Sequence, residues 1–285
     1  MANVRLIKRR IRSVQNIAKI TRAMEMIAAL KMRRAQERGL AGRPYAEKIY
    51  QVISDLSALP ATGRTSHPLL QRRPVNKIAV VHITPDRGLC GGLHANLNRK
   101  TAGFILEQNV PVTLTVVGRK GRDIMRRYGR DIRAEFIQIG DQPSLLDTLP
   151  ISRIVIDDYT DGLIDQVYLV YAQFVSTMVQ KPVLKQILPV EPAAIPVAQN
   201  VDYIYEPGAD AVLDELLPRF VEMQVYHAIL ESIASEQSAR MVAMRSATDN
   251  ATELVDELTL VHNKARQEMI TKELLDITGG AAALV

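Results

Sequence analysis

The chain has 285 residues, 47% of them hydrophobic, which is enough to bury a sizeable core and excludes a wholly disordered protein. Its single cysteine, Cys90, excludes an internal disulfide, a CxxC redox pair and a zinc site built from cysteines. No apolar run approaches the roughly 20 residues that cross a membrane, and the N-terminus does not resemble a secretion signal. We therefore expect a soluble protein of a reducing compartment.

Charge and helix breakers divide the chain into three parts. Residues 1–43 contain twelve Lys or Arg against two Glu, and residues 209–285 contain thirteen acids against six bases. The two ends therefore carry net charges of +10 and −7, and the middle is nearly neutral. All 14 prolines lie between Pro44 and Pro218, so both ends are expected to be long helices.

The first of these helices is predicted over residues 3–38. The pattern continues to about Ser57, with Gly39, Gly42 and Pro44 marking either a kink or a stop. Apolar residues at spacings of three and four predict one slowly drifting buried face. These residues are Ile7, Ile11, Val14, Ile17, Ile20, Met24 and Ile27.

The centre alternates short apolar runs with helical stretches. Strands are predicted at residues 77–84, 112–117, 132–139 and 166–174, and helices at 93–108, 119–128 and 144–159. The helix at 119–128 is strongly basic. Strands that alternate with helices indicate a Rossmann-like, mainly parallel sheet. The prolines from Pro182 to Pro207 are expected to lead out of this domain in extended form.

The last helix is predicted over residues 219–278, which contain neither Gly nor Pro. A strict four-three alternation, typical of a two-stranded coiled coil, runs along it. Its positions are Leu230, Ala234, Gln237, Met241, Met244, Thr248, Ala251, Val255, Leu258, His262, Ala265 and Met269. The opposite charges of the two ends favour pairing them with each other, although apolar burial must supply most of the stability. The fold class is therefore α/β plus a long coiled coil, with domains at 1–58, 75–190 and 209–285.

No motif in the sequence strongly predicts a catalytic, nucleotide-binding or metal-binding site. Residues 84–92 form a Gly-rich turn between a strand and a helix, but they lack the endings of a P-loop and of a dinucleotide fingerprint. A structural or docking turn is the better interpretation.

Cys90 lies near His94 in the sequence, but no third residue that would orient the histidine as a base is evident. A small buried thiol is therefore favoured over a catalytic nucleophile. The five histidines show no spacing typical of a metal site. Residues 1–43 contain no aromatic residue, which disfavours nucleic-acid binding.

Four stretches together resemble the gamma subunit of F-type ATP synthases of the bacterial type, essentially from end to end. They are residues 13–29, the loop Asp86–Gly92, residues 235–251, and residues 270–276 with the small-residue end at 280–283. The resemblance implies an antiparallel coiled coil of the two end helices, with the α/β domain at its foot. It also implies a non-catalytic rotor subunit without metal or cofactor, which couples proton flow to ATP synthesis or hydrolysis and regulates the ATPase.

The resemblance implies partners and contact residues as well. The partners are the alpha and beta subunits of the catalytic head, the epsilon subunit and the c-ring of the membrane sector, with the complex at the cytoplasmic face of the cell membrane. Contacts with the head are expected from Met24, Lys31, Arg33, Arg266, Gln267 and Thr271. Contacts of the foot with epsilon and the c-ring are expected around Tyr203, Tyr205 and Glu206. Two rival hypotheses are an enzyme acting on a nucleotide and a nucleic-acid-binding coiled-coil protein.

Overall fold

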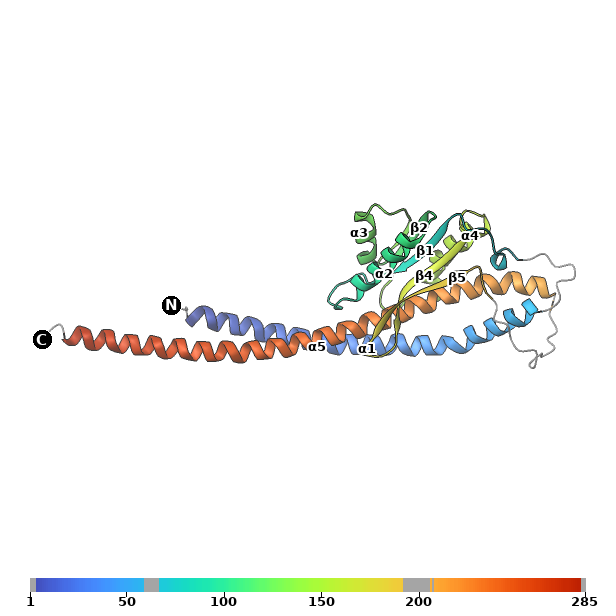
Figure 1. The fold of residues 1–285 in the computed structure, drawn as a ribbon. Coiled ribbons are helices and arrows are strands. Elements are labelled where there is room, and N and C mark those ends of the chain that lie inside the picture. The colour runs from blue at the N-terminus through green and yellow to red at the C-terminus, as the bar shows by residue number, and fades with distance from the viewer. Residues whose placement is uncertain (1–3, 59–66, 192–205, 207, 283–285) are drawn as a thin grey trace. The chain divides into compact units, whose positions relative to one another are not determined.

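A computed structural model describes residues 4–58, 67–191, 206 and 208–282 of the chain (Figure 1). Two compact units are present, one made of Met1–Ala28 with Arg240–Val285 and the other of Ala29–Ala239. The elements in chain order are α1 (Val4–Ala58), η1 (Pro68–Leu70), β1 (Ile78–Ile83), α2 (Leu93–Glu107), β2 (Val112–Val117), α3 (Arg119–Arg127), β3 (Ile132–Phe136), α4 (Leu145–Thr160), β4 (Gln166–Phe174), β5 (Gln180–Leu188) and α5 (Ala209–Ala282).

The predicted fold class is confirmed: in chain order, a mainly parallel sheet lies between two long terminal helices. Helix α1 continues through Pro44 and ends at Ala58, so the glycines and the proline do not stop it. One reason lies at Gly42, where an added Cβ would stand 2.7 Å from Cε1 of His227 on α5. A larger residue at this position would require the His227 side chain to shift, so glycine favours the close packing of α5 against α1 beside the proline. The division by sequence into 1–58, 75–190 and 209–285 remains a prediction.

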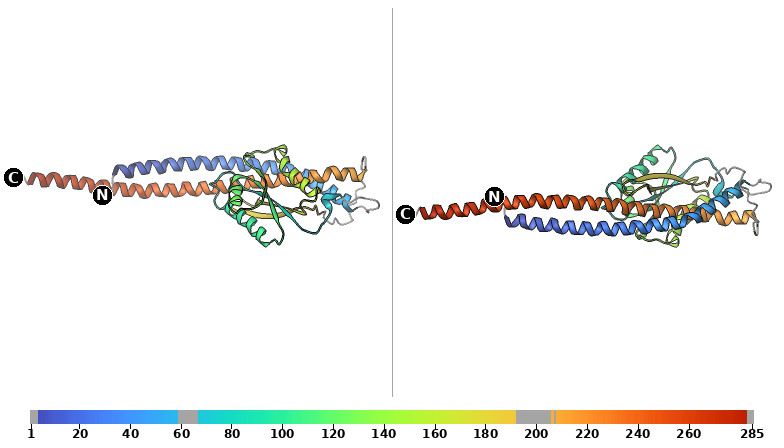
Figure 2. Two further views of the ribbon diagram at one scale, coloured as in Figure 1. Left: turned by 90° about the horizontal axis from the view of Figure 1, so that it is seen from above. Right: turned by 90° about the horizontal axis from the view of Figure 1, so that it is seen from below.

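In the first unit, residues 4–28 of α1 run beside α5 in both views of Figure 2. The predicted face of α5 is confirmed as far as Ala265, because its residues there are buried or half-buried, whereas Met269 is exposed.

The predicted face of α1 is wrong in part. Ile17, Ile20 and Ile27 are 49%, 59% and 52% exposed, whereas Thr21 and Ala28 are buried. The true seam follows a strict seven-residue repeat rather than a drifting one. Small side chains in the middle of this repeat, from Thr21 to Gly42, let the two helices approach closely there, whereas Ile17, Ile20 and Ile27 lie outside the repeat. The buried or half-buried positions of the repeat are Ile7, Val14, Thr21, Ala28, Ala35, Gly42, Ile49 and Leu56.

The sheet of the second unit has the strand order β3-β2-β1-β4-β5. Strands β1 to β4 run parallel, and β5 pairs with β4 in the antiparallel direction. Strand β5 was not predicted, because Pro182 and the prolines after it favoured an extended segment leading out of the domain. Pro182 stands opposite Ala172 in a strand at the sheet edge, where a residue without an N–H group is tolerated.

Alternate residues of the strands face two hydrophobic layers. Val80 and Leu114 point to the layer beneath α2 and α3, and Val81 and Leu169 point to the layer on the opposite face. This second layer contains side chains of α4, of α1 from Ala35 onward and of α5 up to Ala234. Both helix segments are thus built into the core of the same unit as the sheet.

A buried polar cluster lies among the apolar residues under α2. His82 on β1 is fully buried and its two ring nitrogens lie 2.8 Å from Asn98 Oδ1 and 2.8 Å from Thr101 Oγ1. Both partners belong to α2. Burial lowers the pKa of His82 to about 4, and the hydrogen bond with Asn98 only partly opposes this effect. The imidazole is therefore neutral at physiological pH.

Candidate partner-binding surfaces

The turn at residues 84–92 joins the carboxyl ends of three strands. Thr84 Oγ1 donates to the carbonyl of Val117 at 3.0 Å and accepts from the amide of Gly121 at 2.8 Å. Asp86 accepts hydrogen bonds from the backbone amides of Arg119 and Gln138, each at 2.9 Å. The carboxylate of Asp86 thus occupies the N-terminus of α3, the position that a phosphate would take in a nucleotide-binding turn.

Backbone packing at this edge is close. Gly118 has a φ of +91°, and a Cβ built on it would lie 1.9 Å from the carbonyl oxygen of Thr84. Leu89 and Gln138 also have positive φ values, 64° and 61°, although they are not glycines. The amide of Gln138 is held in this conformation by its bond to Asp86. These contacts support the interpretation of residues 84–92 as a structural turn.

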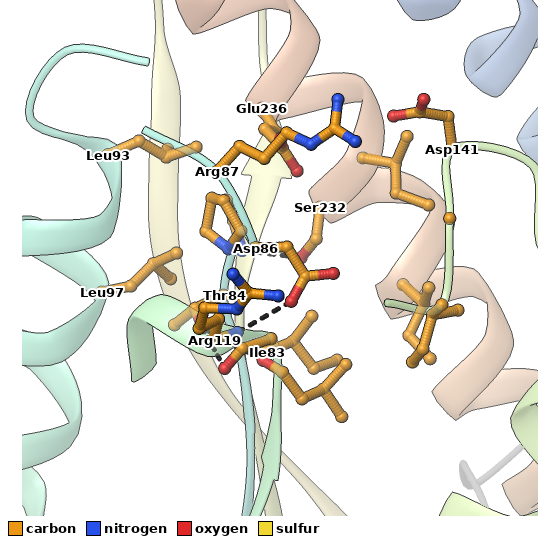
Figure 3. A pocket seen from close by; sticks show the side chains of 18 of the residues that line it. Ile83, Thr84, Asp86, Arg87, Leu93, Leu97, Arg119, Asp141, Ser232 and Glu236 are labelled. Carbon is orange, nitrogen blue, oxygen red and sulfur yellow. Dashed lines mark hydrogen bonds between the residues drawn. The ribbon is translucent and has the colours of Figure 1, made fainter. Parts of the chain in front are cut away.

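A cavity of about 410 Å³ opens beside this turn. Figure 3 shows Leu93 and Leu97 of α2 on one side of it and Ser232 and Glu236 of α5 on the other. Asp86, Arg87 and Arg119 lie at the carboxyl ends of the strands. The charged groups that line the cavity are three carboxylates and two guanidinium groups. The carboxylates belong to Asp86, Asp141 and Glu236, and the guanidinium groups to Arg87 and Arg119. This charge balance disfavours a triphosphate.

The loop after β3 ties the sheet to both long helices. Asp141 forms an ion pair with Lys31 of α1 at 2.6 Å and accepts a hydrogen bond from Gln237 of α5 at 3.1 Å. Arg38 of α1 donates to Gln142 at 2.9 Å. Lys31, predicted to contact the catalytic head, therefore has an internal partner, and its side chain is only 33% exposed.

Cys90 and His94 lie together, with Sγ 3.9 Å from Nδ1. The thiol is fully buried and also lies 3.8 Å from the carbonyl of Arg87. A nucleophile needs access to a substrate, and Cys90 has none. The structure thus agrees with the small buried thiol that the sequence favoured.

The predicted head contacts of the first unit lie on accessible surface. Arg266, Gln267 and Thr271 are exposed on α5, and Thr271 Oγ1 donates to the carbonyl of Gln267 at 2.9 Å. Met24 is half-buried on α1. The first three side chains lie within two turns of one helix and can be contacted together.

Two predicted contacts of the second unit are also accessible. Arg33 is exposed and pairs with Glu37 one turn later at 3.0 Å. Glu206 is exposed, whereas Tyr203 and Tyr205 lie outside the described residues. A pairing between exposed residues of one helix contributes about 0.3 to 0.5 kcal/mol, so Arg33 could exchange Glu37 for a partner at little cost.

One ion pair was not foreseen. Asp158 on α4 is 8% exposed and pairs with Arg133 at 3.2 Å. Only the three-dimensional fold brings β3 beside this turn of α4. The sequence contains no periodic signal that links the two residues.

Within the ranges that the structure describes, no group of three or more His, Cys, Asp or Glu side chains is placed to hold a metal ion. None of the described helices is both long enough and apolar enough to cross a bilayer.

Comparison with known proteins identifies the family. The family model described as ATP synthase matches residues 3–284. The ATP synthase gamma chain of Dehalococcoides mccartyi is 71% identical over 284 residues, and the match covers 100% of both chains. The chain belongs to the gamma-chain family of ATP synthases. The gamma chain of Herpetosiphon aurantiacus is 52% identical, over 100% of this chain and 99% of its own.

Solved structures agree with this assignment. A chain of the Tetrahymena thermophila mitochondrial ATP synthase, in a structure of the central stalk and c-ring, has a TM-score of 0.61 and 25% identity over 80% of this chain and 99% of its own. A chain from the Euglena gracilis mitochondrial ATP synthase has a TM-score of 0.66 at 19% identity, over 99% of this chain and 94% of its own, and thus supports the fold. The predicted function, a central-stalk rotor subunit, is confirmed at the level of the family, which forms part of a membrane-associated complex.

Proposed function

We propose that the chain is a non-catalytic rotor shaft, which turns inside the alpha and beta subunits of a catalytic head and has its foot on epsilon and a c-ring. Twelve large apolar side chains of the first unit are exposed, seven of them on α5 between Leu260 and Ile277. Exposed apolar residues at this density mark a surface that a partner covers. This surface is the observation that carries the proposal.

The shaft works by differential contact. A rotating subunit can drive a partner between conformations only if each of its faces stabilises one conformation more than another. The first unit has faces of different chemistry: Ile17 and Ile20 form an apolar face on α1, whereas Arg266 and Gln267 form a polar site on α5. Such faces can bias three beta subunits toward different nucleotide states without covalent chemistry.

Contacts with the catalytic head lie on the long helices, and contacts with epsilon and the c-ring lie at the foot. Arg266, Gln267 and Thr271 form a polar contact with the beta subunits, and Met24 lies near their moving loops. Lys31 is a weaker candidate because Asp141 already pairs with it, whereas exposed Arg33 remains accessible. The region of Tyr203, Tyr205 and Glu206 contacts epsilon and the c-ring, at the cytoplasmic face of the membrane.

The second unit supports a role without catalysis. The N-terminus of α3 is satisfied by Asp86, and the cavity beside it contains more carboxylates than guanidinium groups. A nucleotide would have to displace Asp86 and then face its negative charge. The isolated chain is therefore expected to neither bind nor hydrolyse ATP above background.

The test uses the assembled complex. Arg266→Ala with Gln267→Ala is expected to leave the amount of assembled complex unchanged and to lower ATP synthesis in energised vesicles several-fold. The matched control is Asn263→Ala with Lys264→Ala, which removes two exposed polar residues one turn earlier on the same helix. Normal synthesis in the first double variant, or an equal loss in the control, would refute the polar contact.

A further inference from the structure

The outer edge of the sheet carries a basic surface that the proposed function does not use. It consists of α3, the turn after it and β3, residues 119–136, and is called here the basic edge. Seven bases and three acids give it a net charge of +4. The bases are Arg119, Lys120, Arg122, Arg126, Arg127, Arg130 and Arg133.

Internal ion pairs neutralise only part of this charge. Arg122 pairs with Asp123 at 2.7 Å, Arg126 with Glu135, and Arg133 with the buried Asp158. The other four bases form no ion pair with any described residue. They are Arg119, Lys120, Arg127 and Arg130, and all four are exposed or half-buried. Four cations on one short helix and its turn repel one another unless an anionic partner is present.

The basic edge also offers an unpaired strand. β3 is the outermost strand of the sheet and pairs only with β2. Because β3 has a partner strand on one side only, one row of its backbone N–H and C=O groups faces away from the sheet. A charge or two is enough to protect such an edge from unwanted pairing. Four further cations exceed that need.

We propose that the basic edge is a docking site for an acidic, extended polypeptide segment of a partner protein. The segment adds to β3 as a sixth strand, and its carboxylates contact Arg127, Arg130 and the cations of α3. Main-chain hydrogen bonds to an edge strand supply affinity, and charge selects the partner. This inference does not depend on the rotor function.

Two other anionic partners fit the observations less well. A lipid surface or a nucleic acid would use the cations of α3, but neither presents the alternating N–H and C=O groups that pair with an edge strand. Nucleic-acid recognition would also use aromatic side chains for stacking. Tyr128 is the one aromatic residue on α3 or the turn after it, residues 119–131. An acidic polypeptide can contact the cations and also pair with the open side of β3.

The experiment measures binding of labelled peptides to the purified full chain by fluorescence anisotropy. The probe is a twelve-residue peptide of alternating Glu and Thr. One comparison peptide replaces Thr by Pro, which keeps the charge and removes half of the N–H groups, and another replaces Glu by Lys. The chain variant is Arg127→Glu with Arg130→Glu, and the matched control is Arg99→Glu with Lys100→Glu, two exposed bases of α2 outside the basic edge.

The Glu-Thr peptide is expected to bind the chain and the α2 control equally, and to bind the Arg127/Arg130 variant about tenfold more weakly, since an exposed ion pair changes an equilibrium constant by up to about fivefold. The Glu-Pro peptide should bind more weakly than Glu-Thr, and the Lys-Thr peptide should not bind. Equal binding to both variants would overturn the site, and equal binding of Glu-Pro and Glu-Thr would overturn strand addition. Binding of phosphatidylserine vesicles without binding of the peptide would assign the basic edge to a membrane and overturn the proposal.

Discussion

The buried histidine of β1 predicts how the stability of the second unit depends on pH. The unfolded chain protonates His82 at a pKa near 6.5, whereas in the folded chain burial lowers this pKa to about 4. The unfolded state therefore binds more protons between these two values. The resulting stability is fully present above pH 6.5 and is lost as the pH falls from 6.5 to 4.

The magnitude follows from the two pKa values. Each unit of difference corresponds to 1.36 kcal/mol, so His82 contributes about 3 kcal/mol across the whole interval. By pH 5 about 2 kcal/mol of this is lost, because the unfolded histidine is then almost wholly protonated and the folded one is not. A loss of this size is a large fraction of the stability of an ordinary domain.

The measurement compares the chain with His82→Gln, which keeps a polar group at the site and does not titrate. Urea unfolding of both proteins is followed between pH 7.5 and 4.5, together with hydrogen exchange of the β1 and β2 amides. Exchange is included because the two compact units need not unfold together. All other titrating groups are shared, so the difference between the two pH profiles reports His82 alone.

Two outcomes are distinguishable. If His82 is neutral and buried as described, the variant loses less stability than the native chain by about 2 kcal/mol between pH 7.5 and 5. Parallel profiles over this range would refute the argument, whatever the absolute stability of the variant. They would mean that water or a conformational change solvates the protonated imidazole.

Two further predictions concern close contacts. Gly118→Ala should prevent folding of the second unit or destabilise it by more than about 3 kcal/mol, because the new Cβ would collide with the carbonyl of Thr84. In the control Gly103→Ala no atom lies within 4 Å of the added methyl group, and thermal unfolding should occur at the same or a higher temperature. Thr21 and Thr248 are linked by a 2.7 Å hydrogen bond, so Thr21→Val alone should cost about 1 kcal/mol in urea unfolding. Adding Thr248→Val should recover part of that loss, and strictly additive losses would contradict the pairing.

The uninterrupted parts of the terminal helices could be predicted because local rules govern them, although α1 continues through Pro44 to Ala58 and α5 begins at Ala209 and continues through Pro218. Residues 219–278 contain no helix breaker, and a four-three repeat read along α5 gave its buried face correctly up to Ala265. The family could also be identified, since residues 235–251 and 270–276 form contiguous signatures. Each of these features is encoded in neighbouring residues.

The buried face of α1 was decided by packing. Large isoleucines such as Ile17 and Ile20 looked like core residues, but the seam uses Thr21 and Ala28 instead. A helix pair approaches most closely where side chains are small, and the sequence of one helix does not reveal how closely its partner comes. Hydrophobicity alone therefore selected three wrong positions, Ile17, Ile20 and Ile27.

In the second unit, too, some features could be predicted from the sequence and others were decided only by the fold. Strands β1, β2 and β4 were predicted within one or two residues from their apolar runs, whereas β5 exists because the edge of β4 accepts it in spite of Pro182. The role of Asp86 depends on amides of Arg119 and Gln138, which are far along the chain. Periodicity and turn chemistry are properties of nearby residues and can be read directly. Contacts between distant residues depend on how the strands and helices are placed in space, so the tertiary structure alone decided them.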